Sequence, residues 1–141
     1  MKKLLLLLLI LFTPIFIFSQ QALHLYGGQD YTIYLGCINC SSYDNNSIWN
    51  EYGDYGSSYS DVSIWNSYSE YGSEYDDYSP WNSYSSTPPK LYDNDGGFYG
   101  YFTINEYQPD WADFKLALFL YKNHNEIRDN VSKWYSLIFE N

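Results

Sequence analysis

The sequence predicts an α+β fold that combines a small antiparallel sheet, short-helix and loop repeats of sixteen residues, and C-terminal helices. Three observations lead to this prediction. Two segments rich in β-branched and aromatic residues follow turn signals, a tandem repeat lies between them, and the composition after Pro109 favours helix.

The sheet is expected from two hairpins. Turn signals at residues 27–30 and 93–97 predict that residues 23–27 pair with 31–38, and that residues 90–93 pair with 97–104. The two regions also resemble each other, since residues 34–43 align with 98–107 at an offset of 64, four times the repeat length. An older duplication of the hairpin is therefore predicted.

The repeat is marked by Trp49, Trp65 and Trp81, each followed by Asn and separated by sixteen residues. Each unit opens with Ser, then Ile or Pro, then Trp-Asn. A Ser at this place is a good N-cap, so each unit is expected to contain one helical turn, which Gly56 and Gly72 would end. Such units usually bury their apolar face against a neighbouring unit.

The aromatic residues of the repeats have two interpretations. The tryptophans and tyrosines either plug into and coat the sheet, or form an exposed surface that binds a sugar or a protein. The low complexity leaves disorder of part of this stretch as a third alternative. The candidate binding residues are Trp49, Tyr52, Tyr55, Trp65, Tyr68, Tyr71 and Trp81.

After Pro109 two helices are expected. Asp110 is the predicted N-cap of a helix over residues 111–121, and a polar linker containing His124 follows. A second helix is predicted from apolar residues spaced on one face, which favours packing on the core over contact with a partner. That face consists of Ile127, Val131, Trp134, Tyr135 and Ile138.

The N-terminus has the layout of a signal peptide. Lys2 and Lys3 precede an apolar run over residues 4–18, and cleavage is expected at Ser19/Gln20 or just after Gln20. An uncleaved anchor is the alternative, although the run is shorter than a spanning helix of about 20 residues. The expected location is periplasmic or secreted from a bacterium, without stable membrane insertion after cleavage. The expected organisation is a signal peptide (1–20) and a single small domain (21–141), itself divided into an N-terminal hairpin (21–46), repeats (47–89), a second hairpin (90–107) and a helical region (109–141).

The charge distribution limits the partners. The formal net charge is −10, and residues 21–89 contain nine Asp or Glu and no Lys or Arg. Such a field repels phosphate backbones and anionic membrane surfaces, so nucleic-acid binding is not expected. It favours divalent cations or basic partners. The oligomeric state is not predicted.

Cys37 and Cys40 form a C-x-x-C pair. A local disulfide or two inert thiols are favoured over a redox pair or half of a zinc site, because neither a βαβ pattern nor further soft ligands accompany them. A disulfide between residues three apart requires a bulge or a strand end. The internal alignment places apolar Tyr101 and Ile104 at the equivalent positions, which supports inert thiols or a disulfide.

No catalytic motif is evident. His24 and His124 are far apart and expected on the surface, and carboxylates among the repeat aromatics lie on Gly- and Ser-rich loops that hold geometry poorly. Calcium is the better chemical hypothesis. Asp93-Asn94-Asp95-Gly96 opens like an EF-hand loop, but Ile104 replaces the final Glu, so a tight turn is favoured; Asp76-Asp77 near Glu74 is a second candidate.

The pattern as a whole resembles a family of uncharacterised bacterial secreted or periplasmic proteins. It includes Leu35-Gly36, Asn50-x-Tyr52-Gly53, Tyr55-Gly56-Ser57 and Pro88-Pro89, and it covers residues 31–105. The resemblance implies export but no activity and no catalytic residue. The sequence departs from the family at its tryptophans and cysteines.

Together these observations predict a non-catalytic exported envelope or secreted module, structural or adhesive, whose Tyr and Trp surface contacts a glycan or a protein. A calcium-stabilised module is the alternative, and a small hydrolase or redox protein is a more distant one. No cofactor other than calcium is expected.

Overall fold

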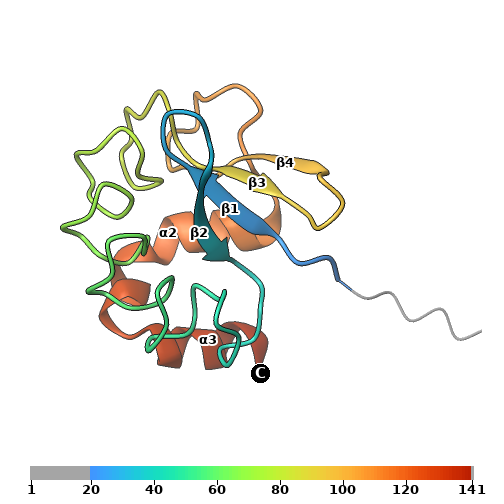
Figure 1. Ribbon diagram of the computed structural model, residues 1–141, viewed down its shortest axis with the longest axis vertical. Helices are drawn as coiled ribbons and strands as arrows, with labels where there is room; N and C mark the ends of the chain where they lie inside the picture. Colours follow the sequence, from blue (N-terminus) through green and yellow to red (C-terminus); the bar gives the residue numbers. More distant parts are fainter. Residues whose placement is uncertain (1–19, 141) are drawn as a thin grey trace, which may run out of the picture.

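The computed structural model describes residues 20–140 of the chain (Figure 1). The predicted signal peptide therefore lies, except for Gln20, outside the described residues. Four strands form one sheet in the order β2-β1-β3-β4, with antiparallel pairing throughout. The strands are β1 (His24–Gly27), β2 (Ile33–Cys37), β3 (Lys90–Tyr92) and β4 (Phe98–Tyr101), and the helices are α2 (Lys115–Asp129) and α3 (Val131–Phe139). The predicted α+β class is confirmed.

The two hairpins have the same geometry. Gly36 of β2 pairs with Leu25, Gly100 of β4 pairs with Leu91, and each hairpin has a register shift at this point. The two glycines have φ of 107° and 106°, a conformation that residues with a Cβ rarely adopt. Because β1 and β3 pair antiparallel at the centre, with Leu25 opposite Leu91, the hairpins are arranged about an approximate two-fold axis.

The structural likeness extends beyond the strands. After β2, the backbone of Cys37 accepts a hydrogen bond from Ile48 and donates one to Asn46. After β4, the backbone of Tyr101 accepts from Ala112 and donates to Asp110. Tyr101, Asp110 and Ala112 lie 64 positions after Cys37, Asn46 and Ile48 and form the same two hydrogen bonds. The alignment at an offset of 64 residues therefore matches residues with equivalent contacts in the structure.

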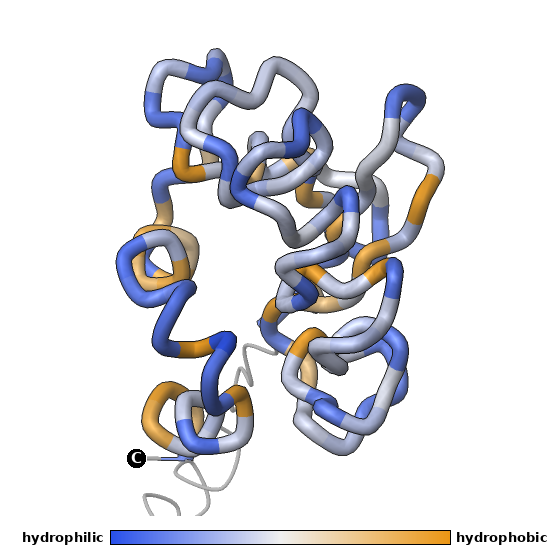
Figure 2. The backbone as a smooth tube through the Cα atoms, turned by 90° about the vertical axis from the view of Figure 1, so that its left-hand side faces the viewer, coloured by the Kyte–Doolittle hydropathy of each residue, from blue (hydrophilic) through white to orange (hydrophobic). Residues whose placement is uncertain are grey.

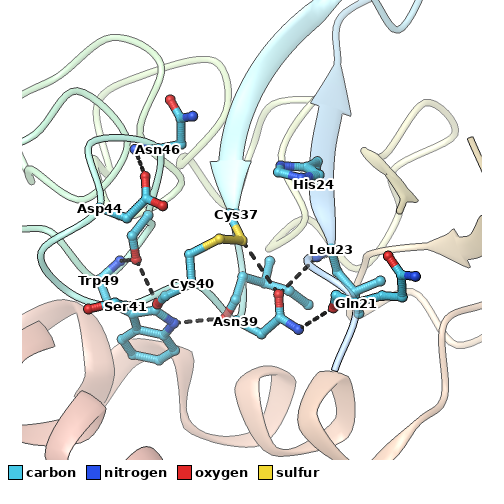
Figure 3. Close-up of a disulfide and its surroundings, with 12 residues drawn as sticks. Gln21, Leu23, His24, Cys37, Asn39, Cys40, Ser41, Asp44, Asn46 and Trp49 are labelled. Atoms are coloured by element: carbon cyan, nitrogen blue, oxygen red, sulfur yellow. Dashed lines mark hydrogen bonds between the residues drawn. A yellow bond between two sulfur atoms is a disulfide. The ribbon is translucent and has the colours of Figure 1, made fainter. Parts of the chain in front are cut away.

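Cys37 and Cys40 form a disulfide at the end of β2 (Figure 3). The chain leaves the strand here, which brings the two Cα atoms to 5.5 Å. Asn39, between the cysteines, fixes the N-terminal segment because its side chain accepts from Leu23 N and donates to Gln21 O, both at 2.8 Å. The predicted disulfide is confirmed, as is its position at a strand end.

Between the hairpins the chain forms consecutive turns instead of strands or helices. In the middle repeat, turns begin at Ser57, Ser60, Ser63, Asn66 and Ser69, and the next repeat begins at Ser73. Four steps of three residues and one of four account for the period of sixteen. At the first four positions the side-chain oxygen accepts a hydrogen bond from the backbone N–H two residues later.

This arrangement corrects the prediction of one helical turn per unit. Ser63, for example, accepts from Trp65 N at 3.1 Å, but the chain turns again at Asn66 instead of continuing as a helix. The Ser is therefore the start of a side-chain-stabilised turn and not an N-cap. Gly72 packs against the backbone of Asn66, where a Cβ would lie 2.0 Å from the carbonyl oxygen, so glycine is required by close approach.

The three tryptophans pack in a row inside the repeats, which we call the tryptophan stack: Trp65 and Trp81 are nearly parallel, at 18°, and Trp49 is tilted by 47° against Trp65. The ring centroids of Trp49 and Trp65 are 5.9 Å apart, and those of Trp65 and Trp81 are 5.6 Å apart. Each indole Nε1–H donates to a backbone carbonyl of an earlier segment, as in Trp65 to Ile48 O at 2.7 Å and Trp81 to Ile64 O at 2.6 Å. The tryptophans thus join successive repeats by stacking and by hydrogen bonds.

Both helices cover one side of the molecule, opposite the turns and the sheet (Figure 2). α2 places His124 flat against Trp81, with centroids 4.5 Å apart and an interplanar angle of 4°. α3 packs Tyr135 and Phe139 on Trp49. The helices therefore complete the core around both ends of the tryptophan stack.

The helix boundaries differ from the prediction. Asp110 is not an N-cap: it has φ of 56°, and its carbonyl accepts from Tyr101 N, which holds this stretch alongside β4. α2 begins only at Lys115 and continues through the expected polar linker. His124 is therefore a half-buried helical residue and not a solvated one, because its ring packs on Trp81.

Candidate functional site

The most conspicuous surface feature is a set of six exposed tyrosines. The first column contains Tyr43, Tyr59 and Tyr75, the second contains Tyr52, Tyr68 and Tyr84, and each ring is at least 85% exposed. Members of one column are separated by sixteen residues. We refer to these residues as the outer tyrosine columns.

The turns place these rings in solvent. The backbone N–H of Tyr68 donates to Asn66 Oδ1 at 3.0 Å, and that of Tyr59 donates to Ser57 Oγ at 3.2 Å. The same bond recurs at every member of both columns. Within residues 20–140, none of the six rings takes part in an aromatic pair, whereas the other aromatic residues of the repeats do. Their backbone is fixed while their rings are free to meet a partner.

The same turns present the buried tryptophans. Trp65 follows Ser63 as Tyr59 follows Ser57, with a comparable hydrogen bond. The three tryptophans are nevertheless at most 2% exposed. The structure places the predicted binding residues Trp49, Trp65 and Trp81 in the core, where no ring face is exposed for a ligand to stack on.

Tyr55 and Tyr71, also predicted as binding residues, are half-buried against the first hairpin. The ring centroid of Tyr55 lies 4.9 Å from that of Tyr34. Tyr71 lies beside Gly27, and its ring stacks on that of Tyr78 with the centroids 6.3 Å apart. Burial is the first cause of the raised pKa of both Tyr55 and Tyr71. These two residues attach the repeats to the sheet.

Of the predicted binding residues, only Tyr52 and Tyr68 belong to the outer tyrosine columns. Sequence reasoning missed Tyr43, Tyr59, Tyr75 and Tyr84. The signal that could have found them is the spacing of three: a Ser or Asn that starts a turn, followed two residues later by Tyr. That signal locates the position of a ring on a turn but not whether the turn faces the core.

Carboxylates surround the columns. Exposed acidic residues of the repeats are Asp44, Glu51, Asp54, Asp61, Glu70, Glu74 and Asp77. Glu74 hydrogen-bonds the neighbouring Tyr75 and so raises the pKa of that phenol. Arg128 of α2 contacts this region and donates to Gly72 O at 2.8 Å. The surface around the tyrosines is therefore strongly negative.

The open face of the sheet also carries aromatic rings, but these contact one another. Tyr26 forms edge contacts with Tyr34 at 5.4 Å and with Tyr92 at 6.0 Å. The ammonium of Lys90 lies 4.0 Å above the ring of Tyr31. Burial, followed by the neighbouring Tyr101, raises the pKa of Tyr31 to about 12. The rings on this face therefore already have partners within the protein, unlike the rings of the outer tyrosine columns.

The histidines are held by hydrogen bonds. His24 Nε2 donates to Asn94 Oδ1 at 2.8 Å, and its Nδ1 is hydrogen-bonded to the Tyr34 hydroxyl at 2.7 Å. His124 Nδ1 donates to Tyr121 O at 2.7 Å, and burial lowers the pKa of His124. The two histidines lie in different parts of the fold.

The predicted calcium candidates have other roles. Asp93 Oδ1 accepts from Asp95 N at 2.9 Å and from Gly97 N at 2.8 Å, which makes the segment the tight turn of the second hairpin. Asp77 accepts from the backbone and hydroxyl of Ser86. Among the described residues, no group of three or more His, Cys, Asp or Glu side chains is arranged to hold a metal ion.

Comparison with known proteins finds no family model, no curated protein and no solved structure that matches this chain. In the part of the chain that the structure describes, neither helix is long and apolar enough to cross a membrane.

Proposed function

We propose that this protein is a non-catalytic exported module, structural or adhesive, whose outer tyrosine columns contact a glycan or protein of the cell envelope or its surroundings. The observation that carries this proposal is the near-complete exposure of six tyrosines at regular intervals. Scattered exposed apolar residues need no explanation, but a repeated array of large rings is typical of an interaction surface.

The chemistry of tyrosine supports this role. Its ring offers a large contact area with only two side-chain torsions to immobilise, and its hydroxyl adds a hydrogen bond. The turn bonds fix the backbone beneath each ring, as between Asn66 and Tyr68, so little backbone conformational entropy is lost on binding. Equivalent rings on successive repeats would add avidity toward a partner that is itself repetitive.

Two features support export. The disulfide between Cys37 and Cys40 is of a kind that persists in oxidising compartments. The first twenty residues have the composition of a signal peptide, which lies almost entirely outside the described residues. We therefore place the proposed contact in the periplasm or outside the cell.

The test is a retention experiment with matched variants. The triple variant Tyr52→Ser, Tyr68→Ser, Tyr84→Ser removes one column. Tyr107→Ser is the control: this residue is 87% exposed and is the counterpart of Tyr43 at the offset of 64 residues, but it belongs to neither column. Purified proteins are passed over immobilised peptidoglycan and over immobilised envelope protein. We expect wild type and Tyr107→Ser to be retained on one of these supports, and retention of the triple variant to fall at least tenfold.

Stability must be measured in parallel. Because the replaced rings contact solvent, each substitution should change the free energy of unfolding by no more than about 0.5 kcal/mol. Equal retention of wild type and the triple variant, or no retention of wild type on either support, would contradict the proposal.

A further inference from the structure

A second surface is independent of the tyrosine columns. A groove with a volume of about 800 Å³ lies between the two helices, the segment before β1 and Tyr99 of β4. Its apolar walls are formed by Leu23, Leu116, Phe119, Leu137, Ile138 and Phe139. Grooves of roughly 300 to 1,000 Å³ with mostly apolar linings are the usual sites for small organic ligands.

The groove leaves apolar side chains in water. Phe119 of α2 and Phe139 of α3 are 39% and 37% exposed, although both also contact the aromatic core through Trp134 and Trp49. These side chains are held in place by the core on one side and present a face to the groove on the other. The groove is therefore preformed and does not depend on a flexible loop.

One end of the groove is positive. The groove is lined here by Phe114, the N-cap of α2, and by Lys115 and Leu116, the first two residues of the helix. The first intrahelical hydrogen bond runs from Leu118 N to Phe114 O, so the preceding N–H groups of the helix have no intrahelical acceptor. No side chain caps this end and no acidic residue lies in the first turn. The helix dipole and the Lys115 ammonium therefore favour an anion here.

The lining contains no negative charge to oppose that end. Lys115 is the charged residue among those that line the groove, and Gln20 and Gln21 are neutral amides. Asp113 lies before the helix but does not line the groove. An apolar groove whose lining includes one localised positive charge matches a ligand with one apolar chain and one anionic head.

We propose that the groove binds a single-chain carboxylate amphiphile, with the acyl chain between α2 and α3 and the carboxylate at the N-terminus of α2 beside Lys115. A second copy of this chain is a poorer occupant, because a formal net charge of −10 on each molecule opposes self-association. This site does not depend on the proposed function of the tyrosine columns.

The test compares three probes with the same chain and different heads: dodecanoate, dodecanol and dodecylammonium. Each is titrated by calorimetry, dodecanoate and dodecylammonium below their micellar concentrations and dodecanol below its solubility limit. We expect saturable binding of one dodecanoate per protein, at least tenfold tighter than that of dodecylammonium. Lys115→Gln should weaken dodecanoate at least fivefold and leave dodecanol within twofold, whereas Lys133→Gln, an exposed lysine on α3 away from the groove, should change neither.

A second pair of variants tests the apolar walls. Phe119→Gln should weaken both dodecanoate and dodecanol at least fivefold, and Leu118→Gln, similarly exposed on the same helix but outside the lining, should have little effect. Each variant is first checked for an unchanged near-ultraviolet circular dichroism spectrum.

Several outcomes would overturn the proposal. These are the absence of saturable dodecanoate binding, equal affinity for the three heads, or equal behaviour of Lys115→Gln and Lys133→Gln. Two further outcomes identify another occupant. A dimer in sedimentation that Phe119→Gln dissociates would assign the groove to a second copy. Dodecanoate binding by a chain that begins at Gln21, but not by the full chain, would assign it to the N-terminal segment.

Discussion

The sheet and the turn repeats hold themselves together in different ways. In the sheet, β1 forms backbone hydrogen bonds with β2, its partner in the first hairpin, and with β3, which lies much later in the sequence. In the repeats, backbone hydrogen bonds between residues 50 and 79 all link residues three or four apart. Successive repeats are joined instead by side chains, chiefly the indoles. Contact between successive repeats therefore depends on the tryptophan side chain of each repeat, whereas contact between strands of the sheet depends on backbone hydrogen bonds.

The largest effect should come from Trp65, at the centre of the stack. Trp65→Ala removes a fully buried ring that contacts both neighbouring tryptophans, and should cost about 3–5 kcal/mol of unfolding free energy. Trp65→Phe keeps a ring but leaves the Ile48 carbonyl without its indole donor, so a smaller loss is expected. Chemical denaturation measures both.

Trp111→Phe is the control for the Trp65 variants. This indole also donates to a carbonyl, that of Thr103 at 2.6 Å, but the residue is half-buried and lies outside the repeats. An equal loss for Trp65→Phe and Trp111→Phe would show that the stack has no special role in cohesion.

The next effect concerns the turns beneath the rings. Ser63→Ala removes the acceptor for the buried N–H of Trp65 and should cost roughly 1–3 kcal/mol. Ser67→Ala changes an exposed serine of the same repeat and should be close to neutral. Thermal melts of the two variants would contradict the turn argument if their midpoints coincide.

The disulfide sharpens the comparison between the two hairpins. The second hairpin has the same geometry with Tyr101 and Ile104 in place of the cysteines, so the fold should survive without the bond. Replacing both Cys37 and Cys40 by Ser removes the cross-link that restricts the unfolded chain. The free energy of unfolding should fall by only about 2 kcal/mol, because the loop that the disulfide closes is short. Loss of cooperative unfolding in this variant would contradict the equivalence of the hairpins.

The smallest effect expected is a dependence on pH through His124, where α2 meets the tryptophan stack. Burial and the nearby Arg128 lower its pKa below the ordinary value of 6.5, so the folded state prefers the neutral ring. The unfolded chain binds the proton more readily, and stability should fall as pH drops below about 6.5.

His124→Gln should reduce the part of this dependence that lies between pH 7 and 5. Unfolding free energies of wild type and variant, measured across this range, isolate the contribution because the carboxylates are common to both proteins. Parallel curves for the two proteins would show that His124 does not contribute.

Much of the sheet was predictable because hairpins are local. The turn signals at residues 27–30 and 93–97 located both hairpins, and the offset of 64 residues anticipated their equivalence. The helical region was predicted in outline, but not its start. Backbone hydrogen bonds of Tyr101 with Asp110 and Ala112, which helix propensity does not reveal, keep residues 110–112 beside β4.

The candidate site was predicted less well. Tyr52 and Tyr68 were identified, but so were three tryptophans that the structure buries, because the same Ser- or Asn-led turn precedes both kinds of ring. The groove between α2 and α3 was not foreseen. Its lining comes from segments that are more than a hundred residues apart, such as Leu23 and Phe139.

The sequence by itself determined the period of the repeats, the turn residues that create it, the two hairpins and the negative charge around the tyrosines, because all of these depend on residues close together in the chain. Only the tertiary structure decided which rings are core and which are surface. That choice is made where the helices and the sheet cover one side of each repeat: Trp65 faces them and is buried, and Tyr68, one turn later, faces water.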